Sequence, residues 1–322
     1  MKQEKTIEVL VKSIHQETPD VKRFSLAPVS MSELPGFSGG SHITTYIKDR
    51  NTTIERHYSL INQPEDTECY QITILLSKTS RGGSHYWHYQ VKVGDRLQVS
   101  YPKNHFTLSF KARHHVFYAA GIGITPFLSM MVELAGREGF FELHYAAKTK
   151  ASCAFYDFLK NKYPKQSHFY FSQERESKRL DYSSLLNHPI GTHVYFCGPE
   201  SFITSFTNAA NQIGYPRTSV HYERFTPPKV QAAASFQVQV QSSEGLTMNV
   251  PKQKTLLEAL LEAGVKVPYS CRVGRCGTCE LNVLEGEIEH YDSFLSEEQK
   301  NAQNVILTCV SRAKTEKIVI EI

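Results

Sequence analysis

Four of the seven cysteines are concentrated near the carboxyl end of the chain. Cys271, Cys276 and Cys279 form a Cys-x4-Cys-x2-Cys run, and Cys309 follows much later. Four thiolates at this spacing are typical of a [2Fe–2S] centre, in which a tight loop supplies three sulfurs and a returning strand supplies the fourth. A structural zinc site is the alternative, but zinc usually takes paired Cys-x2-Cys knuckles and only one such pair is present. The spacing therefore predicts a [2Fe–2S] cluster.

A second group of residues has the chemistry that a flavin requires. Arg56, His57, Tyr58 and Ser59 follow one another at the start of a β-rich run, and a glycine-rich turn lies at residues 81–84. The tyrosine offers a ring, the serine offers a hydroxyl to the hydride-accepting nitrogen, and the arginine and the turn amides can bind phosphate. Each motif is weak alone, and an ordinary strand followed by a turn is the alternative.

Two further motifs lie where predicted strands end. Residues 118–126 pass from a strand into a helix, where Gly121 and Gly123 allow close approach of the backbone and the helix start favours a pyrophosphate. Residues 197–199, Cys-Gly-Pro, end another strand at the edge where parallel sheets bind ligands. The first run lacks the three-glycine dinucleotide fingerprint, and a lone Cys-Gly-Pro marks only a strand end. Together they indicate a nicotinamide site.

The elements that must position these motifs fall into three stretches. Short β-rich runs separated by turns predict an antiparallel β-barrel or sandwich, at 6–13, 21–26, 42–47, 57–60, 70–76 and 96–100. Alternating strands (116–120, 141–147, 168–172, 193–197) and helices (126–136, 155–163, 201–213) predict an α/β domain with a parallel sheet. A hairpin (236–240, 246–250), a helix (256–263) and closing strands (305–310, 318–322) predict an α+β domain.

Composition limits the function classes. A chain of 322 residues is long enough for two or three domains. A formal net charge of +4 is too small for a nucleic-acid binder. The most apolar stretch, residues 116–135, is interrupted by glycines and a proline, so we expect no membrane span, and the first residues lack a secretory signal. Seven cysteines are an odd number and four of them are clustered, which fits a metal site in a reducing compartment better than the disulfide framework of a secreted protein. We therefore expect the protein in the cytoplasm.

In this order, followed by a cysteine-rich module, the motifs resemble the phthalate dioxygenase reductase family, which includes the reductase components of vanillate demethylase and carnitine monooxygenase. The resemblance covers essentially the whole chain. It implies a multidomain fold: an antiparallel FMN-binding β-barrel (residues 1–110), a NAD-binding α/β domain with a parallel sheet (111–226), a linker (227–235) and an α+β (β-grasp) plant-type ferredoxin domain (236–322).

The same resemblance, carried over motif by motif, implies a set of site residues. Those at the flavin are Arg56, His57, Tyr58, Ser59, Thr73, Ile74, Leu75, Arg81, Gly82, Gly83, Ser84 and Phe225. Those at the nicotinamide are Gly121, Gly123, Thr125, Pro126, Cys197, Gly198 and Pro199, with Thr125 also closing the flavin pocket. The candidate catalytic residues are Ser59, Cys197 and Glu223. Phe225 has a simpler interpretation as a buried aromatic residue at a domain end.

Three departures from the family pattern affect this transfer. Ala120 replaces one glycine of the usual Gly-Gly-Ile-Gly, Leu75 occupies a position that is often basic, and Arg272 and Arg275 lie in the cluster loop. The glycine-rich turn at residues 81–84 resembles the family's FMN-phosphate loop, and FMN is therefore preferred to FAD.

The implied activity is electron transfer. Nicotinamide gives two electrons as hydride and a [2Fe–2S] cluster accepts one, so a flavin must act between them. The resemblance implies the reductase component of a two-component oxygenase that passes electrons from NADH to a Rieske-type terminal oxygenase of the carnitine or aromatic-acid demethylase class. NADPH is possible, because basic residues follow the second and third parallel strands: Lys148, Lys150, Arg175 and Arg179. Another acceptor, such as a ferredoxin, cytochrome or diiron oxygenase, and a redox-inactive zinc-stabilised interaction protein are the alternatives.

Overall fold

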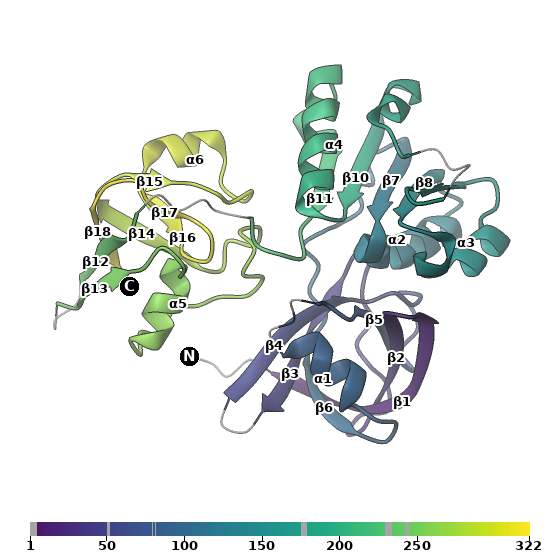
Figure 1. Ribbon diagram of the computed structural model, residues 1–322, viewed down its shortest axis with the longest axis horizontal. Helices are drawn as coiled ribbons and strands as arrows, with labels where there is room; N and C mark the ends of the chain where they lie inside the picture. Colours follow the sequence, from purple (N-terminus) through teal and green to yellow (C-terminus); the bar gives the residue numbers. More distant parts are fainter. Residues whose placement is uncertain are drawn as a thin grey trace. The chain divides into compact units, whose positions relative to one another are not determined.

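The computed structural model describes residues 5–49, 52–78, 80, 82–174, 179–228, 234–241 and 245–322 (Figure 1). The chain divides into two compact units, Met1–Glu223 and Arg224–Ile322. The first unit contains two large sheets and the second contains one. In the described part of the chain, no helix is both long and apolar enough to cross a membrane.

The first sheet has six strands in the order β4-β3-β6-β1-β2-β5, and every neighbouring pair is antiparallel. Its strands are β1 (Thr6–Thr18), β2 (Val21–Pro28), β3 (His42–Asp49), β4 (Thr52–Ser59), β5 (Tyr70–Leu75) and β6 (Arg96–Ser100). An isolated bridge between Leu60 and Ile72 brings the edge strands together, so the sheet curls into a barrel. Helix α1 (Gly83–Tyr89) buries Trp87 in the apolar core of this barrel.

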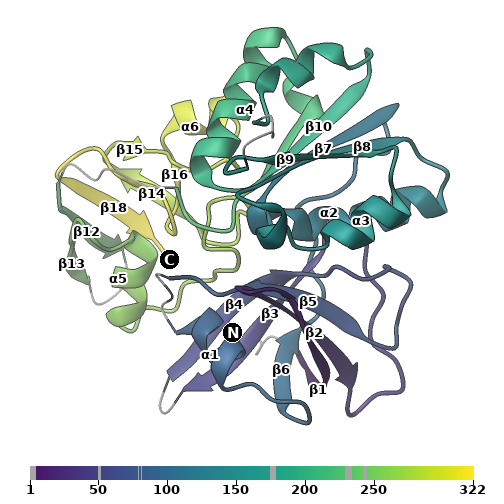
Figure 2. The ribbon, with the colours of Figure 1, turned by 45° about the vertical axis from the view of Figure 1, so that its right-hand side comes forward.

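The second sheet has five parallel strands in the order β11-β10-β7-β8-β9. They are β7 (His114–Ala120), β8 (Phe141–Ala147), β9 (Ser167–Phe171), β10 (Thr192–Cys197) and β11 (Val220–Glu223). Successive side chains of β7 point to opposite faces, so Phe117 and Tyr118 lie in two separate apolar clusters. Helices α2 (Thr125–Gly136) and α3 (Tyr156–Lys162) contribute to the first cluster, and α4 (Glu200–Ile213) contributes to the second (Figure 2).

The third sheet is mixed, in the order β13-β12-β18-β14-β16, with β12 and β18 parallel and the other pairs antiparallel. Its strands are β12 (Phe236–Gln241), β13 (Thr247–Val250), β14 (Glu280–Glu285), β16 (Val305–Leu307) and β18 (Lys317–Glu321). A two-stranded sheet, β15 (Ile288–Glu289) with β17 (Arg312–Ala313), and helix α6 (Glu297–Ala302) complete the domain.

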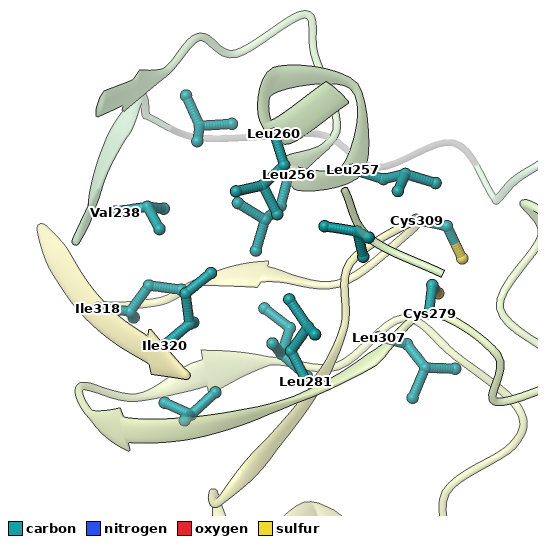
Figure 3. Close-up of a cluster of buried hydrophobic side chains, with 14 of the residues drawn as sticks. Val238, Leu256, Leu257, Leu260, Cys279, Leu281, Leu307, Cys309, Ile318 and Ile320 are labelled. Carbon is teal, nitrogen blue, oxygen red and sulfur yellow. The ribbon is translucent and has the colours of Figure 1, made fainter. Parts of the chain in front are cut away.

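Helix α5 (Leu256–Glu262) packs its apolar face against the third sheet. It begins with a capping box, in which Thr255 and Glu258 satisfy each other's backbone amides. Figure 3 shows Leu256 and Leu260 above Ile318 and Ile320 of β18, with two cysteine side chains at one end of this apolar cluster. Cys279 and Cys309 therefore belong to the edge of this apolar core.

The three sheets confirm the predicted fold class. The prediction of residues 81–84 as a loop is wrong at its end, because α1 begins at Gly83, and Arg81 lies outside the described residues. The predicted strand at 305–310 is too long, since it ends at Leu307 and the chain turns before Cys309. Strands β11 and β14 and helix α6 were not predicted. The domain boundaries stay predictions, and residues 229–233 of the predicted linker lie outside the described part of the chain.

Candidate functional site

The cysteine loop is held by close contacts at two glycines. Gly274 and Gly277 have φ of +76° and +73°, a region that side chains other than glycine rarely adopt. A Cβ atom at Gly277 would lie 2.4 Å from the Phe294 ring, and one at Gly274 would lie 2.6 Å from the Val310 side chain. The loop between the first three cysteines therefore tolerates only glycine at these positions.

The four thiols come together as two pairs. A hydrogen bond from the Cys271 thiol lowers the pKa of Cys276 to about 4. A hydrogen bond from the Cys309 thiol lowers the pKa of Cys279 to about 7. Figure 3 shows Cys279, the residue before β14, next to Cys309. The pKa values of Cys271 and Cys309 are raised, because each thiol donates its proton to the other member of its pair and both are buried. Each pair thus holds one thiol beside one sulfur that ionises readily, and iron binds cysteine as thiolate.

The pairing agrees with the donor set of a two-iron cluster. Cys271, Cys279 and Cys309 are buried, and Cys276 is partly exposed. Backbone amides of Val273 and Gly274 donate toward Cys271 and Cys309, so their dipoles face the sulfurs as they do around iron–sulfur clusters. Among the described residues, no group of three or more His, Cys, Asp or Glu side chains is arranged to hold a metal ion. Four thiols in two pairs match the number of protein ligands that a [2Fe–2S] cluster requires.

On the first sheet, β4 places the predicted phosphate-binding arginine against the start of α1. A Cβ atom at Gly83 would lie 2.5 Å from Arg56 Nε, so the guanidinium stem lies directly over the glycine. A cleft of about 200 Å³ adjoins this contact; it is lined by Ile54, Ser80, Gly82, His85, Tyr86 and Gln90. The amide of Ser77 donates to the Ser84 hydroxyl at 3.2 Å. The structure thus places Arg56 against Gly83, within the predicted turn, and the role of these residues at a flavin stays a prediction.

The other predicted flavin residues of β4 lie on both sides of the strand. Tyr58 packs edge-on against Trp87, with ring centroids 6.0 Å apart, and burial raises its pKa well above the ordinary value. His57 Nδ1 lies 3.0 Å from the Thr44 hydroxyl. Ser59 is buried at the end of the strand, directly opposite His42 of β3.

On β5, Thr73 provides an independent observation. Its hydroxyl is buried, and within the described residues it has no hydrogen-bond partner. A buried hydroxyl without a partner costs free energy unless a ligand satisfies it. Ile74 bonds through its carbonyl to His88 Nε2 at 2.9 Å, and Leu75 is partly exposed. The donor set around β4, β5 and α1 therefore fits a flavin.

In the parallel sheet, the two predicted nicotinamide motifs touch. A Cβ atom at Gly123 would lie 2.1 Å from the carbonyl oxygen of Cys197 and 2.7 Å from the amide nitrogen of Gly198. Both motifs follow neighbouring parallel strands, β7 and β10, whose carboxyl ends meet at one edge. Thr125 is buried and its hydroxyl donates to the Ile122 carbonyl at 3.0 Å, while Pro126 occupies the first turn of α2.

The structure also places two candidate catalytic residues side by side. Cys197 ends β10 opposite Glu223, which ends β11. Both side chains are buried, with 0% of Cys197 exposed. Contact between Cys197 and a nicotinamide therefore requires a displacement of the residues that cover it. Phe225, 43% exposed, belongs to the second unit, and its proposed place over the flavin stays a prediction.

One acidic residue near the nicotinamide edge was missed at the sequence level. Glu174 lies just beyond β9, and its carboxylate accepts a hydrogen bond of 2.6 Å from the amide of Lys150, just beyond β8. The Lys150 ammonium lies over the Tyr156 ring, 4.7 Å from its centroid. An acidic residue following a parallel strand was the available signal. Arg175 lies outside the described residues.

Comparison with known proteins gives two domain matches. Residues 238–314 match the family described as a 2Fe-2S iron-sulfur cluster binding domain, which includes all four clustered cysteines. Residues 99–220 match the N-terminal domain of a dimethylamine monooxygenase subunit DmmA-like family. The first match covers most of the third sheet but not β18, and the second covers β7 to β10 of the parallel sheet.

Similarity to whole proteins extends over nearly the entire chain. The carnitine monooxygenase reductase subunit of Escherichia coli (strain K12) is 40% identical, with 98% of each chain covered. The heme-dependent oxidative N-demethylase beta subunit of Ectopseudomonas mendocina (strain ymp) is 39% identical, with 98% of this chain and 99% of that one covered. The solved structure of phthalate dioxygenase reductase, described as modular for electron transfer from pyridine nucleotides to [2Fe-2S], has a TM-score of 0.76 at 29% identity, with 98% of each chain covered.

Proposed function

This chain belongs to the phthalate dioxygenase reductase family of NAD(P)H-dependent flavin and [2Fe–2S] oxidoreductases, and we propose that it is the reductase component of a two-component oxygenase with a Rieske-type partner. The observation that carries this proposal is the presence in one chain of paired thiols, a flavin-compatible barrel and a parallel sheet with a nicotinamide edge. In this proposal the oxygenase that the chain serves is of the same class as carnitine monooxygenase and vanillate demethylase, whose reductases are similar to this chain.

In this proposal the cofactors are held by named residues. Cys271, Cys276, Cys279 and Cys309 would hold the [2Fe–2S] cluster. Residues of β4 and β5 would line FMN, and Arg56 with residues 82–84 would hold its phosphate. A bound flavin would supply the conversion between the two electrons of a hydride and the single electrons that a [2Fe–2S] cluster accepts. The chain's own contribution is to position and shield these groups: Thr73 and Ser59 offer buried hydroxyls, and the apolar core below the cysteine loop excludes water.

Cofactor content tests this proposal directly. We expect the purified protein to contain one flavin together with the two irons and two acid-labile sulfides of a [2Fe–2S] cluster. Released flavin should chromatograph as FMN, because the phosphate contacts end at Arg56 and the short turn beside it. Stoichiometric zinc without iron would overturn the proposal, since a zinc-stabilised protein would then be the better description.

The coenzyme is proposed to be NADH. An acidic side chain that follows a parallel strand can bind the ribose hydroxyls of NADH and repel the additional phosphate of NADPH. Glu174 occupies such a position beside the Lys150 amide. We expect kcat/KM in steady-state kinetics to be higher for NADH than for NADPH. Glu174→Gln should reduce the ratio of these two values. A preference of the unmodified protein for NADPH of about tenfold or more, equivalent to about 1.4 kcal/mol, would contradict this prediction.

A second candidate partner is a haem-dependent N-demethylase. The similarity of residues 99–220 to the dimethylamine monooxygenase subunit family, and of the whole chain to a heme-dependent oxidative N-demethylase beta subunit, favours it. Co-purification of the partner followed by its optical spectrum separates the two, because haem has an intense Soret band that Rieske clusters lack. We also propose a cytoplasmic location, since reduced cysteines are needed to assemble the cluster.

A further inference from the structure

A loop of the first sheet is hydrogen-bonded to helix α2 of the parallel sheet. The amide of Gly39 donates to Glu133 Oε2 at 2.6 Å, and the amide of Gly40 donates to the Ser129 hydroxyl at 3.2 Å. Both acceptors are buried: Glu133 is 7% exposed and Ser129 is 0% exposed. In Figures 1 and 2, α2 lies on the side of its sheet that faces the first sheet. We call these two hydrogen bonds the domain clamp.

The backbone of this loop lies directly on the helix. A Cβ atom at Gly39 would lie 2.8 Å from Met130 Cα, and one at Gly40 would lie 2.1 Å from the carbonyl oxygen of Phe106. Asn104 holds the loop from its other side, since its Nδ2 donates to Ser38 Oγ at 2.7 Å and to the Gly39 carbonyl at 2.9 Å. The loop is therefore fixed by α2 on one side and by Asn104 on the other. A side chain at Gly39 or Gly40 would clash with neighbouring backbone atoms.

The acceptor in the clamp is a buried carboxylate. Arg137 Nη2 lies 3.0 Å from Glu133 Oε1, so both carboxylate oxygens have partners. Burying a carboxylate carries a desolvation cost that an apolar side chain of similar volume would avoid. If this position only had to hold the two sheets together, a leucine side chain would do so without the desolvation cost of a carboxylate. A charged, two-sided acceptor instead sets the direction and distance at which the loop meets the helix.

The residues on both sides of the domain clamp are close, in the chain or through a hydrogen bond, to residues proposed to bind a cofactor. On one side, Ser129 lies one turn along α2 from Thr125, which follows the nicotinamide turn (Gly121–Ile124). On the other side, the Ser41 carbonyl accepts a hydrogen bond of 2.8 Å from the amide of Leu60, the residue after Ser59. A displacement at the clamp therefore moves the flavin-side serine relative to the nicotinamide turn.

We propose that Glu133 and Ser129 are positioning residues for hydride transfer: they hold the barrel at the separation and angle that transfer from nicotinamide to flavin requires. This inference rests on the function proposed above. The clamp residues touch neither coenzyme in this scheme and act through Gly39 and Gly40. A misplacement of about 1 Å between reacting groups can reduce a rate about a hundredfold, so loss of the clamp should appear in the rate of hydride transfer.

Stopped-flow reduction of the flavin by NADH in the full-length holoprotein tests the proposal. We expect Glu133→Ala to slow reduction about tenfold or more at saturating NADH, with the dissociation constant for NADH nearly unchanged. Glu133→Gln should restore part of the rate, because its amide oxygen can still accept from Gly39. Ser129→Ala removes the second acceptor and should have a smaller effect. Glu138→Gln, which changes an exposed carboxylate just beyond the same helix, should match the unmodified protein.

Hydrogen–deuterium exchange of residues 36–41 gives a readout that does not depend on activity. We expect faster exchange of this segment in Glu133→Ala and no change in Glu138→Gln. If Glu133→Ala does not fold, Ser129→Ala and Glu133→Gln carry the same test. Wild-type rates in all folded clamp variants, or a loss confined to NADH affinity, would overturn the positioning role. Failure of the unmodified holoprotein to reduce its flavin with NADH would instead overturn the proposed function.

Discussion

Replacing Cys279 with serine should abolish electron delivery to the acceptor protein, while NADH should still reduce the flavin. Cys279 is paired with Cys309, and the shift of its pKa to about 7 makes it a good thiolate ligand. Serine is a poor ligand for iron, so one iron loses half of its protein ligands and the cluster does not assemble stably. Hydride reaches the flavin before any electron reaches the cluster, so the first half-reaction does not need Cys279.

The measurement compares two assays on the same preparation. One follows flavin absorbance after mixing with NADH without acceptor, and the other follows reduction of the purified oxygenase partner. Cys69→Ser is the matched control, because Cys69 is a partly exposed thiol in a turn of the first unit, outside the clustered four. Equal loss of both activities in folded Cys279→Ser protein would contradict the proposed order of electron transfer. Retention of full iron content would contradict its role as a ligand.

Gly123→Ala should eliminate productive nicotinamide binding. The new Cβ would lie 2.1 Å from the Cys197 carbonyl oxygen and 2.7 Å from the Gly198 amide nitrogen, and both obstacles are backbone atoms that cannot rotate away. The two motifs at the carboxyl edge must therefore move apart. Forcing a methyl group into a packed interior typically costs about 1–3 kcal/mol, and this contact is at the severe end. We expect a lower melting temperature of the first unit and a large loss of NADH-dependent flavin reduction.

Gly136→Ala is the matched control, because apart from the chain neighbours and the backbone of its own helix no atom lies within 4 Å of the Cβ position there. Removing a flexible glycine at a compatible site stabilises proteins by about 0.4–1 kcal/mol, so this variant should melt at the same or a slightly higher temperature. Chemical reduction of the cluster in the second unit should be unchanged in both variants. Normal NADH kinetics in Gly123→Ala would show that the contact between the two motifs is not needed for coenzyme binding.

The cysteine spacing and the two hydrophobic periodicities were readable without a structure. The cluster prediction depends on four thiols, three of them within nine consecutive residues (271–279), and local spacing nearly determines that loop. β-rich runs and buried apolar runs predicted one strand for each of β1 to β10, but the predicted β1 ended five residues early and the predicted β4 began five residues late. The parallel sheet followed from the regular alternation of strands and helices, because such connections place helices over both faces.

The shorter elements were not readable. Helix α1 begins at Gly83, and residues 82–84 read locally as a turn; its helical state depends on Trp87 being buried between Phe24 and Tyr58 of the barrel. Strand β14 follows the last cysteine of the loop directly, and only pairing with β16 and β18 defines it. In both cases tertiary packing outweighed local preference.

What only the tertiary structure decided are the contacts between distant segments. The sequence alone determined which residues can ligate iron, bind a flavin phosphate or approach a pyrophosphate, because these depend on side-chain chemistry and short spacings. It could not show that Gly123 meets Cys197, that Arg56 lies over Gly83, or that Glu133 receives the Gly39 amide, since each pair is separated by at least one complete strand or helix. Such contacts arise from how sheets and helices pack. Glu133 lies buried in a largely apolar helix, and only the tertiary structure shows that it accepts a hydrogen bond from the Gly39 amide.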